Sequence, residues 1–363
     1  MYRFQSFSRL RGKKVLNKTK PWVPAVSIII VNYNGSKFIG NCIGSALDNK
    51  YADFEIIFVD NASSDGSVEF VKEKFGHDKR LCIVKNDRNL GFAEGNNVGA
   101  NVARGNYIAF LNPDTMVNPN WLKESLKVLK IDPTIGVCQS KLLSIENQKI
   151  IDSAGDFIDY YGVMMRRGGD LKEKDVGQYD KVEEIFSARA AAMMVRRKVI
   201  NEVGLFDPTF FMTYEDIDFC WRVHLRGYKV VFAPKSIVYH VGEAFTPTEF
   251  KVFFTTRNWL ISLIKNYELK TLGKIFPSVV ALIVSILAAE IIVRKRPDLA
   301  LRRVMGILWI VRYLRAIYKE RLKVQLQIRR LADSEVMKHM VETNLAVLHW
   351  LPLWRRQYQE LDK

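Results

Sequence analysis

Several short polar segments contain the residues whose chemistry is most specific, and Asp114 is the first of them. It follows Asn112-Pro113 after an apolar run and lies too early to cap the helix that we expect to begin at Pro119. A carboxylate there suits a divalent cation that bridges two phosphates, because Mg²⁺ and Mn²⁺ take oxygen ligands and leave positions open for substrate. His240 is a candidate further ligand, although a single histidine is more often structural.

Residues 59–66, with the sequence VDNASSDG, form a second candidate. Asp60 ends an apolar run and has no helix to cap, so its carboxylate can accept a hydrogen bond from the imide N–H of a nucleobase. For Ser64 and Asp65, capping of the following helix is the better explanation.

Residues 88–97, with the sequence RNLGFAEGNN, form a third candidate. Its glycines permit a close approach of the backbone, and the start of a predicted helix offers N–H groups and a positive dipole to a phosphate. Arg88 adds a positive charge. A purely structural turn explains the same segment equally well.

Residues 214–222, with the sequence YEDIDFCWR, form a fourth candidate. Glu215, Asp216 and Asp218 lie at the start of a predicted helix, where the helix dipole alone favours acids. One carboxylate that faces a pocket would nevertheless be able to act as the general base for a hydroxyl nucleophile.

Alternating strands and helices must position these clusters. We expect buried strands at 26–31, 54–59, 81–84 and 107–111, and helices at 36–49, 66–75 and 91–103. This alternation predicts an α/β fold with a doubly wound, mostly parallel sheet. Ligands of such sheets bind beyond the carboxyl ends of the strands, where the polar clusters lie.

The second half of the chain has a more mixed pattern. We expect helices at 215–226 and 249–265 and strands at 229–233 and 237–239. Residues 275–293 are the most apolar stretch but contain Pro277, Ser285 and Glu290, so they are borderline for a membrane span. We expect a helix in the membrane interface, with a packed soluble or oligomer-forming helix as the alternative. Residues 299–331 and 345–354 have the pattern of basic amphipathic helices.

The charge distribution divides the chain into three parts. Residues 1–24 carry +7, residues 25–264 carry −1 and residues 265–363 carry +10. We expect a basic lead, a catalytic domain and a basic helical region within these bounds. A near-neutral middle argues against binding of nucleic acid, and basic ends favour an anionic membrane surface, with merely solvated ends as the alternative.

The cysteines and the N-terminus indicate the compartment. Four widely spaced cysteines without a CxxC pair argue against a zinc site or a disulfide framework. Five basic residues interrupt any apolar run in the first fourteen residues, which argues against a signal peptide. We therefore expect a cytoplasmic catalytic part.

Taken in order along the chain, the polar segments resemble the family 2 inverting glycosyltransferases with the GT-A fold, especially their rhamnosyltransferase-like members. The resemblance covers residue 26 to about residue 260, and its segments are SIIIVNYNG, VDNASSDGS, NLGFAEGNN, NPDT, DSAG, FFMTYEDIDFCWR and VYH. Each segment is a weak signal alone, but seven in this order are specific.

The resemblance implies a role for each matching residue. Asp216 matches the base that deprotonates the acceptor hydroxyl during a single displacement with inversion. Asp114 matches the last acid of the DxD motif, and His240 matches a further ligand of a Mg²⁺ or Mn²⁺ ion. The residues that match the nucleotide and donor pockets are Asn32, Tyr33, Asn34, Asp60, Asn61, Arg88, Asn89, Gly91, Phe92, Asn96, Asn112 and Asp114. Those that match the sugar or acceptor side are Asp152, Ser153, Glu215 and Trp221, and Arg257 and Asn258 match residues near the leaving diphosphate.

Two departures refine this expectation. Asn112 occupies the first acid position of DxD, which leaves the strictness of the cation requirement open. The QxxRW motif of processive synthases is absent from the sequence, which favours the addition of one sugar over polymerisation.

The resemblance and the charge together imply the partners. We expect a UDP- or dTDP-sugar donor, a lipid-linked glycan acceptor and a peripheral position on the inner face of the cell membrane, with homo-oligomers through the C-terminal helices as an alternative. A sugar-1-phosphate nucleotidyltransferase would need a glycine-rich phosphate loop after the first strand, where Asn32-Tyr33-Asn34-Gly35 stands instead. A non-catalytic membrane scaffold with the same fold would not release a nucleoside diphosphate.

Overall fold

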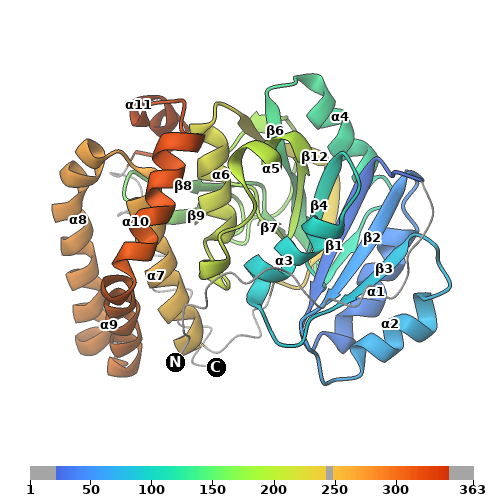
Figure 1. Cartoon of the computed structure of the whole chain (residues 1–363), viewed down its shortest axis with the longest axis horizontal. Helices are drawn as coiled ribbons and strands as arrows, with labels where there is room; N and C mark the ends of the chain where they lie inside the picture. Colours follow the sequence, from blue (N-terminus) through green and yellow to red (C-terminus); the bar gives the residue numbers. More distant parts are fainter. Residues whose placement is uncertain (1–21, 243–247, 343–363) are drawn as a thin grey trace.

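The computed structural model describes residues 22–242 and 248–342. The predictions for most of the basic lead and for the apolar segment 345–354 lie outside these residues. Figure 1 shows a twisted sheet covered by helices on both faces, with a group of C-terminal helices at the end opposite β3.

Four parallel strands form the first half of the sheet. They are β1 (Val26–Asn32), β2 (Phe54–Asp60), β3 (Leu81–Lys85) and β4 (Tyr107–Leu111). The strand β1 lies between β2 and β4, with Asn32 opposite Asp60 and Ile30 opposite Leu111. All four predicted strands are confirmed to within one residue at each end.

Helices cover both faces of this half because the side chains of β1 alternate. Ile28 and Ile30 pack with α1 (Ser36–Leu47), α2 (Ser67–Phe75) and α4 (Trp121–Ile131). Ile29 and Val31 point to the other face, where they pack with α3 (Gly91–Val102) and α6 (Glu215–Leu225). Both faces are therefore buried, as the continuous apolar runs predict.

The second half of the sheet is mixed. β11 (Ala192–Arg196) runs antiparallel between β4 and β6 (Ile135–Ser144). β12 (Lys229–His240) runs parallel to β6 and joins the two strands expected at 229–233 and 237–239, with an irregularity between Ala233 and Ile237. The short strands β5 (Thr115–Val117), β7 (Ile151–Ser153) and β10 (Glu183–Glu184) pair antiparallel at the margins.

Smaller elements connect the strands and helices of the sheet. The strands β8 (Asp156–Ile158) and β9 (Met164–Arg166) form a separate hairpin. Helix α5 (Arg197–Val203) follows β11, and the 3-10 turn η1 (Pro208–Phe210) precedes α6. Helix α4 begins at Trp121, two residues later than expected from Pro119.

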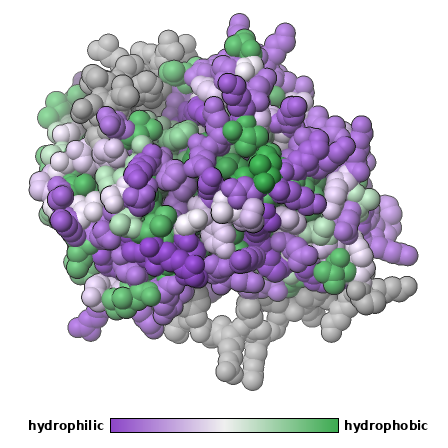
Figure 2. Space-filling view, turned by 90° about the horizontal axis from the view of Figure 1, so that it is seen from above, coloured by the Kyte–Doolittle hydropathy of each residue, from purple (hydrophilic) through white to green (hydrophobic). Residues whose placement is uncertain are grey.

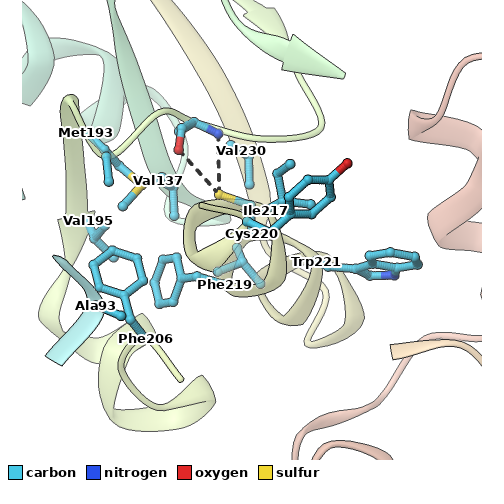
Figure 3. Close-up of a cluster of buried hydrophobic side chains, with 14 of the residues drawn as sticks. Ala93, Val137, Met193, Val195, Phe206, Ile217, Phe219, Cys220, Trp221 and Val230 are labelled. Carbon is cyan, nitrogen blue, oxygen red and sulfur yellow. Dashed lines mark hydrogen bonds between the residues drawn. The ribbon is translucent and has the colours of Figure 1, made fainter. Parts of the chain in front are cut away.

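The buried face of α6 anchors that helix in the core. Figure 3 shows Phe206, Phe219, Cys220 and Trp221 among the packed side chains, and the Cys220 Sγ accepts a hydrogen bond from the Ala188 N–H at 3.3 Å. The anchoring fixes the N-terminus of α6, where Asp216 lies.

The C-terminal helices pack beside α6. Their bounds are α7 (Thr248–Asn266), α8 (Leu269–Ala288), the π-turn η2 (Ala289–Val293), α9 (Pro297–Arg312), α10 (Leu314–Lys323), η3 (Val324–Ile328), α11 (Asp333–Val336) and η4 (Met337–His339). The chain then returns to the end of β8, where Val341 forms a parallel bridge with Asp159. Among the described residues, one helix, Leu269–Val293, is long and apolar enough to cross a membrane.

Candidate active site

Asp114, His240 and Asp152 meet beyond the carboxyl ends of β4 and β12. The His240 Nε2 atom lies 3.4 Å from the Asp114 Oδ1 atom and 3.5 Å from the Asn112 Nδ2 atom. On the other side of the ring, Nδ1 lies 2.9 Å from the Asp152 Oδ2 atom. Residues 114, 152 and 240, far apart in sequence, therefore share one site.

The charges in this group stabilise one another. Burial opposes protonation of His240, but the hydrogen bonds to Asp114 and Asp152 outweigh it and raise its pKa to about 9. Burial opposes ionisation of Asp152, but His240, Arg189 and Arg166 lower the pKa of this carboxyl well below its usual range. Asp152 thus fixes the orientation of the imidazole.

Two oxygen atoms at this position fit a cation. Within the described part of the chain, the buried Asn112 Oδ1 atom has no hydrogen-bond partner, and the Asp114 Oδ1 atom faces the His240 Nε2 atom at 3.4 Å. No group of three or more His, Cys, Asp or Glu side chains in residues 22–242 and 248–342 is arranged to hold a metal ion on its own. Asp114 and, once it has lost its proton, His240 therefore offer a partial ligand set that substrate oxygens would complete.

Arg189 connects this group to the start of α6. The Arg189 Nε atom lies 2.9 Å from the Asp156 Oδ2 atom, and its Nη1 atom lies 3.7 Å from Asp152. Its positive charge also acts on Asp216. Contacts through Asp152 and Arg189 thus extend from Asp114 and His240 towards Asp216, and Asp60 is not part of this chain of contacts.

Asp216 has the electrostatic setting of a base. Burial, followed by the negative charge of Asp156, raises its pKa to about 6 against the opposing effect of Arg189. The Asp216 Oδ1 atom accepts a hydrogen bond from the Ile217 N–H at 2.8 Å. Burial and then the charge of Asp216 raise the pKa of Glu215 well above its usual value. The two carboxyls therefore titrate as a pair.

The loop before Asp216 has an unusual backbone. Phe211, Thr213 and Tyr214 have φ values of 59°, 64° and 64°. Residues other than glycine rarely adopt this left-handed backbone region. The surrounding structure must therefore hold the loop in place. The Asn258 Nδ2 atom donates to the carbonyl oxygens of Phe210 at 2.9 Å, Met212 at 2.8 Å and Thr213 at 2.7 Å.

Arg257 and Asn258 do not have the position expected for a diphosphate site. Arg257 is buried, donates to the carbonyl oxygens of Thr209 and Phe210, and stacks on Phe254 and Trp309. All of these contacts are internal because α7 packs directly against the loop at 209–213. The expectation for both residues is corrected: they hold the loop that precedes Asp216.

Trp221 and Ser153 also have structural positions. Trp221 is fully buried and packs edge-on against Phe186 and Tyr267, since it lies on the core face of α6. Ser153 is buried and donates to the Asp156 Oδ1 atom at 2.8 Å. Neither side chain is exposed to a sugar, which corrects both expectations.

The candidate site for the nucleobase lies at the carboxyl ends of β1 and β2. The backbone N–H of Ser63 donates to both oxygens of Asp60, at 3.3 and 3.2 Å. The Asn34 Oδ1 atom accepts from the Ser64 N–H, and Tyr33 is exposed. Asn32 is buried, and its Nδ2 atom donates to Ser63 and Ser67. Asp60 lies at the same sheet edge as Asn112, with β1 between them.

The N–H groups at the start of α3 already have a hydrogen-bond partner within the protein. The N–H groups of Phe92 and Ala93 donate to the Phe211 carbonyl oxygen at 2.6 and 3.3 Å, and a Cβ at Gly91 would lie 2.5 Å from that oxygen. The expectation that these N–H groups are available to a phosphate is therefore corrected. Gly91, with φ 79°, is required by the close approach of Phe211.

The other residues of that segment stabilise the turn. The Asn61 Nδ2 atom donates to the Gly91 carbonyl oxygen, and the Asn89 Oδ1 atom accepts from the Gly91 N–H, both at 2.9 Å. The buried Asn96 donates to the Phe92 carbonyl oxygen, and Arg88 is exposed. This arrangement is that of a structural turn.

Sequence reasoning missed Arg189, Asp156 and Arg166. The Arg166 Nη1 atom lies 3.5 Å from the Asp152 Oδ1 atom. Arg189 interrupts the small apolar run 188–195, a position where a charge is unexpected, and that signal would have identified it.

Comparison with known proteins shows which family part of the chain resembles. Residues 27–204 match the family described as Glycosyl transferase family 2. This segment is therefore similar to family 2 glycosyltransferase domains. The matched residues include Asp60, Asp114 and Arg189, while Asp216 and His240 lie beyond them.

A curated relative is also described as a glycosyltransferase. An uncharacterized glycosyltransferase of Methanocaldococcus jannaschii is 28% identical over 208 residues, which cover 57% of this chain and 67% of that protein. The chain spans between 24% and 67% of the length of the first curated relatives it matches.

Two solved structures share the fold. Staphylococcus aureus TarS, residues 1–349 with UDP-GlcNAc, has a TM-score of 0.53 at 16% identity over 86% of this chain and 88% of that chain. GalNAc-T7 with UDP, GalNAc and Mn²⁺ has a TM-score of 0.52 at 18% identity over 68% of this chain and 48% of that chain. The expected GT-A-like fold is thereby confirmed.

Proposed function

We propose that the protein transfers one sugar from a nucleotide-sugar to a hydroxyl group of a glycan, with inversion and with Asp216 as the general base. The observation that carries the proposal is the charged network that joins Asp114 and His240 to Asp216 through Asp152 and Arg189. This network supports the proposal, because glycosyl transfer requires a base near the site of the leaving diphosphate.

The chemistry is a single displacement. The acceptor oxygen attacks the anomeric carbon while the bond from that carbon to the nucleoside diphosphate breaks. Asp216 takes the proton of the acceptor hydroxyl, and the diphosphate leaves with the bonding electrons. Because attack comes from the side opposite the leaving group, the configuration at the anomeric carbon inverts.

A pKa of about 6 suits this role. Near neutral pH Asp216 is mostly ionised yet remains more basic than an ordinary aspartate. Arg189 limits the increase in pKa that burial and Asp156 cause. We infer that Arg189 keeps the base available at the pH of the cytoplasm.

A divalent cation fits beside the leaving diphosphate. Asp114 and His240 would hold it, and the unpartnered oxygen of Asn112 beside them supports this assignment. When bound, such a cation supplies positive charge that stabilises the leaving diphosphate. GalNAc-T7, which shares the fold, was solved with Mn²⁺.

The donor and acceptor are proposed from the resemblance and the charge. The nucleotide is UDP or dTDP, with a rhamnose-like sugar, and Asp60 accepts a hydrogen bond from the base. The acceptor is a lipid-linked glycan of cell-envelope polysaccharide synthesis, presented at the inner face of the membrane. The +10 charge of residues 265–363 supports this location, because anionic lipids attract such segments.

A screen of nucleotide-sugars tests the proposal. The purified protein is heated with each UDP-, dTDP- and GDP-sugar, with and without Mn²⁺, and the melting temperature is recorded. A specific increase with one donor, together with slow release of its nucleoside diphosphate, is expected. Failure of every donor to stabilise the protein, with no diphosphate released, would favour a non-catalytic scaffold.

A further inference from the structure

The helices α8 and α9 have exposed apolar stripes. In α8 the side chains of Phe276, Val280 and Val284 are 61%, 42% and 58% exposed and follow each other at a spacing of four residues. In α9 the corresponding residues are Leu301, Leu308 and Val311, at 59%, 60% and 65% exposure. We call these six residues the apolar face. Because α8 and α9 contact each other, their stripes belong to one end of the molecule (Figure 1).

This pattern differs from that of an ordinary surface helix. A helix of a soluble domain turns its apolar side to the core. Only Ile275 and Val279 of α8 are buried in the described structure, although the helix is strongly apolar. Figure 2 shows hydrophobic side chains among hydrophilic ones over the same end of the molecule. Exposed apolar area of this extent marks a surface that another phase or molecule covers.

A buried ion pair fixes how α8 lies. Glu290, in η2 at the end of α8, is fully buried, and its Oε1 atom lies 2.9 Å from the Arg303 Nε atom. Arg303 also donates to the Thr256 hydroxyl at 2.9 Å, which ties α9 to α7. A transmembrane position of α8 would separate Glu290 from Arg303 and leave an unpaired charge in an apolar phase. The helix therefore lies along the protein surface.

The charge around the apolar face selects its partner. Exposed bases accompany the stripes, among them Lys270, Lys274, Lys295, Arg302, Arg312 and Arg315. The acids of residues 269–330 are each engaged: Glu290 by Arg303, Asp298 by Arg296 at 2.8 Å, and Glu320 by Lys323 at 3.6 Å. A second copy docked on the same face would bring like charges together, whereas anionic lipid headgroups complement them.

We propose that α8 and α9 insert their apolar face into one leaflet of an anionic bilayer, in the plane of the membrane and without crossing it. Apolar side chains enter the acyl boundary, and the flanking lysines and arginines contact lipid phosphates. This mode of docking refines the proposed membrane location and rests on it, but it requires no glycosyl transfer.

The docking surface is linked to the candidate base through α7. Thr256 contacts Arg303 of α9, and Asn258, two residues further on, holds the carbonyls of the loop before Asp216. Helix α7 therefore contacts both the docking surface and the loop before Asp216, so the two are joined by one helix.

Vesicle sedimentation of the full-length protein tests the surface. The vesicles are phosphatidylcholine alone or with about a third phosphatidylglycerol, a fraction chosen to give an anionic surface. We expect binding to the anionic vesicles and at least a tenfold loss of affinity in the double variant Val284→Glu/Leu308→Glu. Val176→Glu is the matched control, since Val176 is 80% exposed but lies on the catalytic half. Equal binding of the double variant would overturn the proposal.

Two further measurements separate the alternatives. Lys274→Cys and Lys295→Cys, near either end of the apolar segment, should both react with an impermeant maleimide added outside sealed vesicles. Protection of one position would indicate a span and overturn the in-plane arrangement. A dimer in solution that the double variant dissociates, without vesicle binding, would indicate a second copy instead. Donor-induced stabilisation should be equal in all these variants, so a failed donor screen affects the proposed reaction and not the docking.

Discussion

The Asp152 carboxylate lies 2.9 Å from the Nδ1 atom of His240, whose Nε2 atom faces Asp114 at 3.4 Å. Residues 88 positions apart thus form a carboxylate–histidine pair that determines which ring nitrogen faces the proposed cation. Asp152 acts on His240 as a positioning residue.

Loss of that carboxylate should weaken cation binding. We expect Asp152→Asn to reduce the affinity for Mn²⁺ by about 10–100-fold, the usual effect of removing such a partner. Titration of donor-dependent stabilisation with Mn²⁺ measures it. Asp170→Asn is the control, because Asp170 contacts Arg166 but not His240. Equal Mn²⁺ affinity in both variants would contradict the positioning role.

The pH dependence of transfer should reflect the raised pKa of Asp216. A base must be deprotonated, so kcat is expected to decrease about tenfold per pH unit below about pH 6 and to reach a plateau above it. Because Asp216 and Glu215 titrate together, the midpoint belongs to the pair. A flat profile between pH 4.5 and pH 7 would be inconsistent with a carboxylate base of this kind.

Asn258 should affect catalysis through the backbone. We expect Asn258→Ala to lower kcat about 10-fold or more with little change in the KM for donor, because three carbonyl groups lose the donor that holds the loop before Asp216. Ser262→Ala on the same helix is the control, since its hydroxyl bonds only to the Asn258 carbonyl within α7. If both variants lose activity equally, the effect belongs to α7 as a whole.

A buried lysine should determine the stability of the junction between α6 and α7. The Lys265 Nζ atom lies 2.6 Å from Asp207 and 3.0 Å from Asp218, and all three side chains are buried. Lys265→Met leaves the buried Asp207 without its cation, while Asp218 keeps Arg222 at 3.0 Å, and the substitution should cost about 3–5 kcal/mol of unfolding free energy. Lys123→Met, on the exposed side of α4, should change that energy by less than about 0.5 kcal/mol. Urea denaturation measures both.

The same pair predicts how stability depends on pH. Burial opposes ionisation of Asp207, but Lys265 and Thr209 outweigh it and lower its pKa to about 2. A lowered pKa stabilises the folded state above the unfolded pKa of about 3.9, and this contribution is lost as the pH decreases towards 2. The wild-type protein should therefore lose more stability than Lys265→Met over this interval.

Local patterns predicted the parallel half of the fold accurately. The strands β1 to β4 are continuous apolar runs that end in polar residues, and both properties depend on near neighbours in sequence. The antiparallel insertion of β11 between β4 and β6 was not predicted, because it depends on pairing between Ala192 and Leu111, residues 81 positions apart. Strand direction of this kind leaves no local signal.

The sequence indicated the charged candidate residues of the site, but it did not indicate the residues that contact and orient them. Asp114, Asp216 and His240 follow strand ends or begin a helix, so their positions were inferable from sequence. Arg257 and Trp221 carry polar or aromatic groups of the expected type, but the packing of α7 and α6 directs them inward. Arg189 was missed because its proposed role depends on the carboxylates of Asp156, Asp152 and Asp216, which come near it only in the folded chain.

The most direct test of the account is the substitution Asp216→Asn, which keeps the size of the side chain and removes the base. We predict that nucleotide-sugar binding changes less than about threefold while kcat for transfer falls by a factor of about 10²–10⁴. Glu124→Gln, a partly buried carboxylate of α4 paired with Lys127, should behave as wild type in both measurements. Normal kcat in Asp216→Asn would contradict the assignment of the base and the mechanism built on it.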